Sequence, residues 1–277
     1  MSTAKRTVLI TGCSDTGLGA ALARAFHNAG LKVYATARNP SKMRGLEAMG
    51  IETLTLDVLD DASIARAASQ ITELDILVNN AGAAYIMPVF DTPVAKSKEL
   101  FELNVWSYLA VTRAFLPLII KSKGMIVNHS SLASVLATPW NSHYSASKAA
   151  IASFSESQRL ELSPFGVRVV DLKTGAVRSN INNLPKPRLP DDSIFVSARE
   201  AVDKSMTFEE VDKQATDSDN WAKAAVADLL KSKPPGIIWR GPKAWLVWLG
   251  TILPHGSLDG KIKSMLGFDA ITKELNG

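Results

Sequence analysis

The sequence predicts an α/β protein in which a parallel sheet carries helices on both of its faces. Short apolar runs alternate along the chain with longer segments in which apolar residues recur every three or four positions. The runs are typical of buried strands, and the longer segments of helices that bury one side. Because strands that alternate with helices pair in parallel through right-handed crossovers, we expect one doubly wound domain of the Rossmann type with about seven strands.

The first half of the chain is expected to give four strands. An apolar run ends at Gly12, and the helix that follows it is terminated by Gly30. Asn39 and Pro40 open another helix, because Asn caps exposed N–H groups and Pro fits the first helical position. The expected elements are strands at 7–11, 32–37, 51–56 and 76–78, with helices at 18–29, after 39 and at 61–71.

The second half is expected to complete the sheet and to add a lid. A long helical stretch at 92–121 should bend at Pro117. Residues 181–216 contain three closely spaced prolines, and we interpret them as a lid over an active site. The other expected elements are strands at 125–128, 167–172 and 237–239, with helices at 146–162 and 219–230.

Composition limits the classes of protein to which the chain can belong. Hydrophobic residues make up 46% of the 277 residues and charged residues 21%, which suits one buried core. The net charge of +4 comes from scattered basic residues and predicts no nucleic-acid partner. The single Cys13 excludes an internal disulfide and fits a reducing compartment. The start is polar and no apolar run has the length of a bilayer span, so we expect a cytoplasmic protein.

The residues after the predicted strands carry the candidate chemistry, because doubly wound sheets bind ligands at the carboxyl ends of their strands. Gly12, Gly17 and Gly19 follow the first strand and open a helix, which suits a pyrophosphate. Cys13 is interpreted as a small filler of this loop. The second strand ends at Arg38 without an acid, which favours NADPH/NADP+ over NAD. The alternative for Arg38 is an ordinary surface arginine.

Tyr144 and Lys148 stand four residues apart at the start of a predicted helix. This spacing places the phenol and the ammonium side by side on one face. A free phenol has a pKa of about 10, and a neighbouring cation is expected to lower it. Taken alone, such a pair is more often a chance pair on a helix surface, so its meaning depends on the other motifs.

Further motifs follow the other strands and the long helical stretch: Asp57-Val58, Asn79-Asn80-Ala81-Gly82, Asn104 and Val127-Asn128-His129-Ser130-Ser131. Together with the glycine loop and the Tyr144/Lys148 pair, they resemble the short-chain dehydrogenase/reductase family over roughly residues 7–180. The resemblance implies that Asn104, Ser131, Tyr144 and Lys148 are catalytic. Ser131 is preferred to Ser130 because its separation from Tyr144 along the chain is the usual one in the family. No metal is implied. The resemblance implies cofactor contacts from Gly12, Ser14, Gly17, Leu18, Gly19, Arg38, Asp57, Val58, Asn80, Ala81, Gly82, Tyr144, Lys148 and Val177.

The chain departs from the usual family pattern at two places. Four residues separate Gly12 from Gly17 where most members have three, which brings Asp15 toward the expected phosphate site. Thr174 and Gly175 stand where the family usually has Pro-Gly. Both departures resemble a mostly fungal branch similar to NADPH-dependent 1-acyldihydroxyacetone-phosphate reductases.

The resemblance implies a reduction. NADPH would supply a hydride to a carbonyl carbon, Tyr144 a proton to the oxygen, and Ser131 a hydrogen bond to that oxygen. Lys148 would hold the nicotinamide ribose, and Asn104 a water that links Lys148 to solvent. We therefore expect NADPH-dependent reduction of an apolar ketone, lipid-like or from specialised metabolism. Oxidation of an alcohol by the same site and a non-catalytic NADP-binding sensor or scaffold are the alternatives.

The substrate is harder to predict. Leu132, Val135, Trp140 and His143 flank the catalytic segments as pocket candidates, each with an alternative place in the core or at the rim. Three cations in or near the lid could meet an anionic head group, although ordinary solvated charges are the more common interpretation. These cations are Arg178, Lys186 and Arg188.

The chain is divided into a catalytic domain at 1–240 and an apolar, Trp-rich extension at 241–277. Trp245 and Trp248 stand beside Lys243 in a segment too short to span a bilayer. Such a composition suits a membrane interface, and we expect peripheral contact with endoplasmic reticulum or lipid-droplet surfaces. A cover for the pocket or a subunit contact is an equally weighted alternative. The resemblance also implies a homodimer or homotetramer that packs through the helices at 92–121 and 146–162.

Overall fold

The computed structural model describes residues 5–179 and 188–276. Seven strands pair in parallel into one sheet of order β3-β2-β1-β4-β5-β6-β7, which confirms the predicted fold class. The chain winds outward from β1 to β3 and then returns to β4 on the other side of β1, the switch point at which such sheets bind ligands. The strands are β1 (Thr7–Thr11), β2 (Lys32–Ala37), β3 (Glu52–Thr55), β4 (Ile76–Asn79), β5 (Met125–His129), β6 (Arg168–Thr174) and β7 (Ile237–Arg240).

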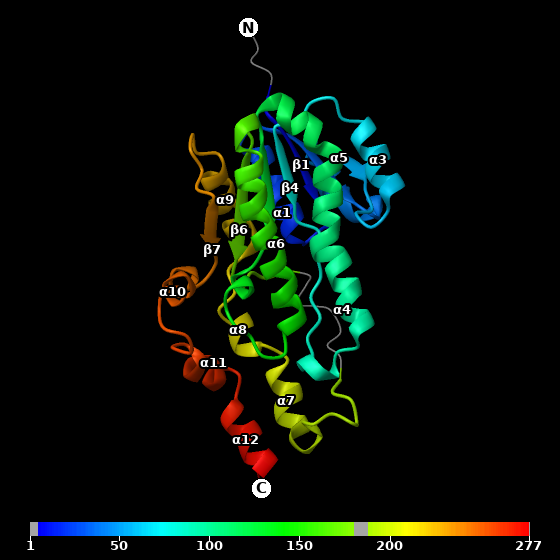
Figure 1. The fold of residues 1–277 in the computed structure, drawn as a ribbon. Coiled ribbons are helices and arrows are strands. Elements are labelled where there is room, and N and C mark those ends of the chain that lie inside the picture. Colours follow the sequence, from blue (N-terminus) through cyan, green and yellow to red (C-terminus); the bar gives the residue numbers. More distant parts are fainter. Residues whose placement is uncertain (1–4, 180–187, 277) are drawn as a thin grey trace.

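Helices cover both faces of the sheet (Figure 1). Successive side chains of β1 are buried in separate cores on the two faces of the sheet: Val8 and Ile10 pack with α1 and α9, and Leu9 packs with α3 and α5. Each such fully buried side chain contributes roughly 1.5–3 kcal/mol. The helices on the sheet are α1 (Leu18–Asn28), α2 (Arg44–Glu47), α3 (Asp61–Ser69), α4 (Val94–Phe101), α5 (Ser107–Ser122), α6 (Ser142–Glu161) and α9 (Ser218–Leu229). Before α2, Asn39 caps a 3-10 helix, η1 (Pro40–Met43), as predicted.

The long helical stretch has an irregularity that the sequence analysis did not predict. It continues through Pro117 to the end of α5, whereas a π-helical turn at Glu102–Trp106 separates α4 from α5. By length and composition the helix at Val94–Ser122 could cross a bilayer, which the sequence analysis did not anticipate. Val111 and Phe115 nevertheless pack fully buried in the core on the sheet, so the helix serves here as a core helix.

The lid and the C-terminal segment meet at one end of the molecule, beyond the carboxyl ends of the strands (Figure 1). Part of the predicted lid, 181–187, lies outside the described residues. Trp140 joins the remainder to the C-terminal segment: its ring stacks on Phe268 at 5.4 Å and meets Phe195 edge-on at 5.2 Å. The helices here are α7 (Arg199–Ser205), α8 (Glu209–Asp212), α10 (Ala244–Gly250), α11 (Asp259–Met265) and α12 (Phe268–Asn276).

Candidate active site

Two glycines after β1 let three segments approach one another closely. Gly12 has φ +75°, and a Cβ there would lie 2.8 Å from Ala81 Cα. A Cβ at Gly19 would lie 2.5 Å from the Gly12 oxygen and 2.6 Å from Asn80 Nδ2. Gly17 precedes α1, whose N-terminus has no side-chain cap among the described residues. Uncapped N–H groups beside a glycine loop fit a pyrophosphate.

The extra residue of this loop turns Asp15 toward η1 and α2. The Asp15 N–H donates to the Lys42 carbonyl, and its carboxylate would lie 3.2 Å from a Cβ at Gly45. Asp15 does not line the cavity that lies beyond the carboxyl ends of the strands. The next residue, Thr16, has a left-handed φ of 65°. Cys13 is fully buried, and burial raises the pKa of its thiol to about 12. The thiol is therefore protonated and unreactive at neutral pH.

A hydrogen-bond chain connects the glycine loop to the end of β6. Asn80 Nδ2 donates to the Thr11 carbonyl at 2.7 Å, which fixes Oδ1 toward His129 Nδ1 at 2.8 Å. His129 Nδ1 therefore carries the proton, and Nε2 accepts from the Thr174 hydroxyl at 2.8 Å. Thr174, the departure from the usual proline, thus supplies a bond that proline lacks.

His129 is a residue that sequence reasoning missed. Burial, with the Lys148 charge, lowers the His129 pKa to about 3, so the imidazole is neutral and can keep both hydrogen bonds. Its ring stacks on Trp221 at 5.3 Å, and its backbone oxygen accepts from Lys148 Nζ at 2.8 Å. The available signal was a lone histidine at the end of an apolar strand, which by itself does not identify a site.

The phenol and ammonium predicted to act together both line the cavity. Lys148 Nζ lies 5.8 Å from the centre of the Tyr144 ring. The predicted lowering of the Tyr144 pKa is wrong for this structure: burial raises it, and the Ser131 hydroxyl only opposes that effect. Burial also lowers the Lys148 pKa to about 8, with Asp171 opposing. Tyr144 therefore stays protonated at neutral pH and is ready to donate.

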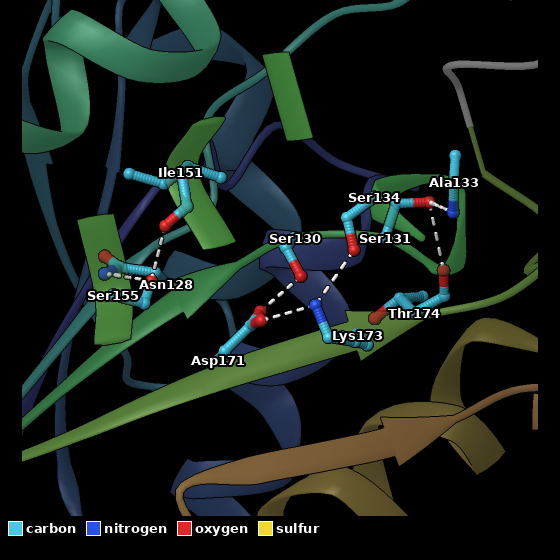
Figure 2. A network of polar contacts seen from close by, with 10 residues as sticks. All are labelled: Asn128, Ser130, Ser131, Ala133, Ser134, Ile151, Ser155, Asp171, Lys173 and Thr174. Carbon is cyan, nitrogen blue, oxygen red and sulfur yellow. Dashed lines mark hydrogen bonds and ion pairs between the residues drawn. The ribbon is translucent and has the colours of Figure 1, made fainter. Parts of the chain in front are cut away.

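The two neighbouring serines have different partners (Figure 2). The Ser130 hydroxyl donates to Asp171, a buried residue of β6. Ser131 Oγ accepts from the Ala133 N–H at 3.1 Å and donates to the Thr174 carbonyl at 3.3 Å. Because the Ser131 hydroxyl is the one beside the Tyr144 phenol, the geometry agrees with the choice of Ser131 made from its spacing.

Asn104 lies in the π-helical turn and is fully buried. Its Oδ1 accepts from the Ala83 N–H, and its Nδ2 donates to the Ala83 carbonyl and to Ser147 Oγ, all at 2.9–3.0 Å. Both amide hydrogens are therefore committed. The side chain joins this turn to α6 and to the loop after β4.

A cavity of about 640 Å³ lies beyond the carboxyl ends of the strands and joins most of the predicted residues. Gly19 and Asn104 do not line it, because they pack behind its wall. Arg38 reaches it from the exposed end of β2, and the described residues give this guanidinium no ion pair. The predicted residues that line the cavity are Gly12, Ser14, Gly17, Leu18, Arg38, Asp57, Val58, Asn80, Ala81, Gly82, Ser131, Tyr144, Lys148 and Val177.

The opposite wall is apolar and comes from α8 and the C-terminal helices. It contains Phe208, Val211, Leu246, Val247, Leu258, Ile262, Met265 and Leu266. Of the pocket candidates, only Leu132 lines the cavity. Val135 is exposed, and Trp140 is the centre of the contact between lid and C-terminal segment. His143 Nδ1 is hydrogen-bonded to Ser97 at 2.8 Å.

Of the three cations predicted in or near the lid, the two that the structure describes do not line the cavity. Arg178 donates to the Ala215 carbonyl at 2.9 Å, and neither it nor Arg188 lines the wall. Lys186 lies outside the described residues. Lys243 and Lys261, which sequence reasoning had not selected for this role, are the cations that the C-terminal segment brings to the wall.

Comparison with known proteins identifies the family. A family model described as short chain dehydrogenase matches residues 6–188. The chain belongs to the short-chain dehydrogenase family. A short-chain dehydrogenase/reductase of Pestalotiopsis microspora is 53% identical over 99% of both chains. The NADPH-dependent 1-acyldihydroxyacetone phosphate reductase of Schizosaccharomyces pombe is 34% identical over 91% of this chain and 90% of its own.

A solved structure of a short-chain dehydrogenase from Streptomyces avermitilis is also similar, with a TM-score of 0.79, 28% identity and coverage of 98% of both chains. These matches confirm the predicted family resemblance, and they make this short-chain dehydrogenase an oxidoreductase that takes a nicotinamide cofactor.

Proposed function

We propose that this short-chain dehydrogenase uses NADPH to reduce a ketone on an apolar, lipid-like or specialised-metabolite substrate. The observation that carries the proposal is the position of Tyr144. Tyr144 lines the same cavity as the glycine loop after β1 and the apolar residues of α8 and the C-terminal helices. A proton donor between a nicotinamide site and an apolar pocket suits carbonyl reduction.

The preference for NADPH rests on the end of β2. Arg38 reaches the cavity there, and the second strand is followed by no carboxylate that could hold a ribose hydroxyl. The S. pombe relative is named as NADPH-dependent, which supports the same choice here.

When bound, NADPH would supply a hydride to the carbonyl carbon. Tyr144 donates its proton to the oxygen as negative charge develops there, and Ser131 donates a hydrogen bond to the same oxygen. Lys148 holds a positive charge behind the phenol and grips the nicotinamide ribose. His129 fixes Lys148 through its backbone oxygen, at 2.8 Å from Nζ.

Oxidation of an alcohol is the weaker alternative. It needs Tyr144 as a base, and burial raises the pKa of this phenol and so opposes that role. A non-catalytic NADP sensor is weaker still, because Ser131, Tyr144 and Lys148 all line one cavity.

The test is NADPH consumption against a panel of ketones that increase in chain length, including acylated dihydroxyacetone phosphate. We expect turnover that improves with apolar length. Absence of NADPH oxidation with every ketone, together with NADP+ reduction by the matching alcohols, would instead establish the oxidative alternative.

We also propose that residues 1–240 form the catalytic unit and 241–277 an extension that meets lipid. The rings of Trp245 and Trp248 are 67% and 49% exposed, while Leu246 and Val247 on the same helix face the cavity. This arrangement would place a cytoplasmic enzyme on endoplasmic reticulum or lipid-droplet surfaces with its pocket beside the lipid. Liposome co-sedimentation should fall when both tryptophans become serine. Equal sedimentation of variant and wild type would refute lipid contact.

A homodimer or homotetramer is proposed from α5 and α6. Trp106, at the end of the π-helical turn before α5, is 46% exposed and edge-on to Phe154 of α6 at 6.0 Å, and Leu160 of α6 is 62% exposed. Apolar side chains on adjacent helices suit a symmetric contact. Light scattering at micromolar concentration should give at least twice the chain mass of 29.8 kDa.

A further inference from the structure

A buried ion pair lies beneath the turn that carries Ser131. Asp171 and Lys173 stand two residues apart on β6, so their side chains share one face. Lys173 Nζ lies 2.6 Å from Asp171 Oδ2, and the two side chains are 5% and 2% exposed. A buried ion pair is costly to desolvate, and apolar residues of similar volume are often at least as stable. Stability alone therefore does not account for these charges.

Each member of the pair holds one of the serines that flank Ser131 (Figure 2). Asp171 accepts from the Ser130 hydroxyl on one side of Ser131, and Lys173 Nζ donates to Ser134 Oγ at 2.9 Å on the other. The Ser134 N–H in turn donates to the Ser131 carbonyl at 3.0 Å and closes the 3-10 turn η4 (Leu132–Ser134). The ion pair thus fixes both ends of the segment that presents Ser131.

Ser131 Oγ is oriented largely from within its own turn. It accepts from the Ala133 N–H at 3.1 Å, and its contact as donor to the Thr174 carbonyl is longer, at 3.3 Å. Its direction toward Tyr144 therefore depends on the backbone of residues 130–134. Misplacement of a catalytic group by about 1 Å can cost roughly a hundredfold in rate.

We propose that Asp171 and Lys173 are positioning residues, whose ion pair clamps residues 130–134 so that Ser131 Oγ meets the substrate oxygen. The inference rests on the proposed function, since it takes Ser131 to bind that oxygen. The competing hypothesis is that the pair only stabilises the packing of β6 on β7, because Lys173 Nζ also lies 5.6 Å from the centre of the Trp239 ring on β7.

The electrostatics give the pair a second, measurable effect. Burial lowers the Lys148 pKa to about 8 and the Asp171 charge opposes this. The other titratable groups that face Lys148 are Tyr144 on its own helix, Tyr108 of α5 and His129 of β5. Loss of the Asp171 charge should therefore move the alkaline limb of activity to lower pH, in addition to any effect on the position of Ser131.

The main test is a mutant cycle. The kcat is measured for Ser131→Ala, for the double substitution Asp171→Leu/Lys173→Met, and for all three substitutions together. The assay uses the panel ketone that the wild type reduces fastest. We expect the double variant to lose roughly tenfold to a hundredfold in kcat, with unchanged NADPH binding by fluorescence and a similar melting temperature. On the Ser131→Ala background the double substitution should have almost no further effect. An equal loss on both backgrounds would overturn the positioning role.

Two further sets of variants complete the test. Ser130→Ala and Ser134→Ala cut the links while keeping the ion pair, and they decide the question if the double variant does not fold. They should reproduce most of the kcat loss, and wild-type kcat in both would refute the clamp. Removal of the exposed pair Lys32–Glu52 by Lys32→Met/Glu52→Gln is the matched control. If Ser131→Ala alone leaves kcat unchanged, it is the proposed function of Ser131 that fails.

Discussion

The two walls of the cavity are held by different kinds of interaction. The cofactor-side wall is joined by hydrogen bonds from Thr11 through Asn80 and His129 to Thr174, each of 2.7–2.8 Å. The substrate-side wall consists mainly of apolar side chains on and beside α8, α10 and α11, with Lys243 and Lys261 among them, and many residues there are exposed on their other side. One wall is fixed by directional bonds, and the other by non-directional packing.

This difference indicates which property of the enzyme each wall controls. Hydrogen bonds fix atoms to within tenths of an ångström, as the alignment of Ser131, Tyr144 and a cofactor requires. Apolar packing tolerates exchange of side chains of similar volume. The substrate range can therefore change through α10 and α11 without disturbance of the chemistry.

The largest effect is expected on the cofactor side. Tyr144→Phe keeps the ring but removes the proton donor, so kcat should fall by roughly 10²–10⁴-fold while NADPH binding is nearly unchanged. Steady-state kinetics and NADPH fluorescence measure the two. Tyr34→Phe on β2, which does not line the cavity, is the control. Substantial reduction by the Tyr144 variant would move the acid role to another group.

Lys148 sets the alkaline limit on the same side. Its pKa is lowered to about 8 by burial, so the charged form disappears as the pH rises past that value. Because Tyr144 has a raised pKa, Lys148 titrates first. We expect kcat/KM for reduction to fall up to tenfold per pH unit above about 8. A profile that stays flat to pH 10 would contradict a required Lys148 charge.

Arg38 should have an effect of about one order of magnitude. A charge-assisted contact to a phosphate contributes about 1.5–3 kcal/mol, so Arg38→Ala should reduce the preference for NADPH over NADH roughly tenfold or more. The measurement is kcat/KM with each coenzyme. The exposed Arg66 of α3, which does not line the cavity, provides the control Arg66→Ala. Equal use of both coenzymes by the wild type would exclude the phosphate contact.

The smallest effect is expected on the substrate side. Leu246→Ala removes apolar surface that a long substrate would cover, so KM for long-chain ketones should rise roughly three- to tenfold. Short ketones should be unaffected, and Leu249→Ala on the same helix, which does not line the cavity, should change neither. A uniform loss with short and long ketones would mean that the two walls are mechanically coupled.

The sequence determined most of the sheet and the cofactor-side wall, because both follow from local patterns. Apolar runs located all seven strands to within a few residues, and Gly12 and Gly19 revealed a backbone that must approach its neighbours. The family resemblance, through its usual separation from Tyr144, favoured Ser131 over Ser130. Each inference uses residues close in sequence or a fixed position at the end of a strand.

The tertiary structure decided what depends on contacts between distant segments. For Trp140 the sequence left a pocket position and a core position open, and the structure places it in a core between Phe195 and Phe268, because the lid and the C-terminal helices close over it. The pKa of Tyr144 was expected to fall but rises, since burial depends on everything packed around the ring and not on Lys148 four residues away. Spacing within one helix fixes which side chains are neighbours. The burial of these side chains, and therefore their pKa values, is fixed only when the whole chain has packed around them.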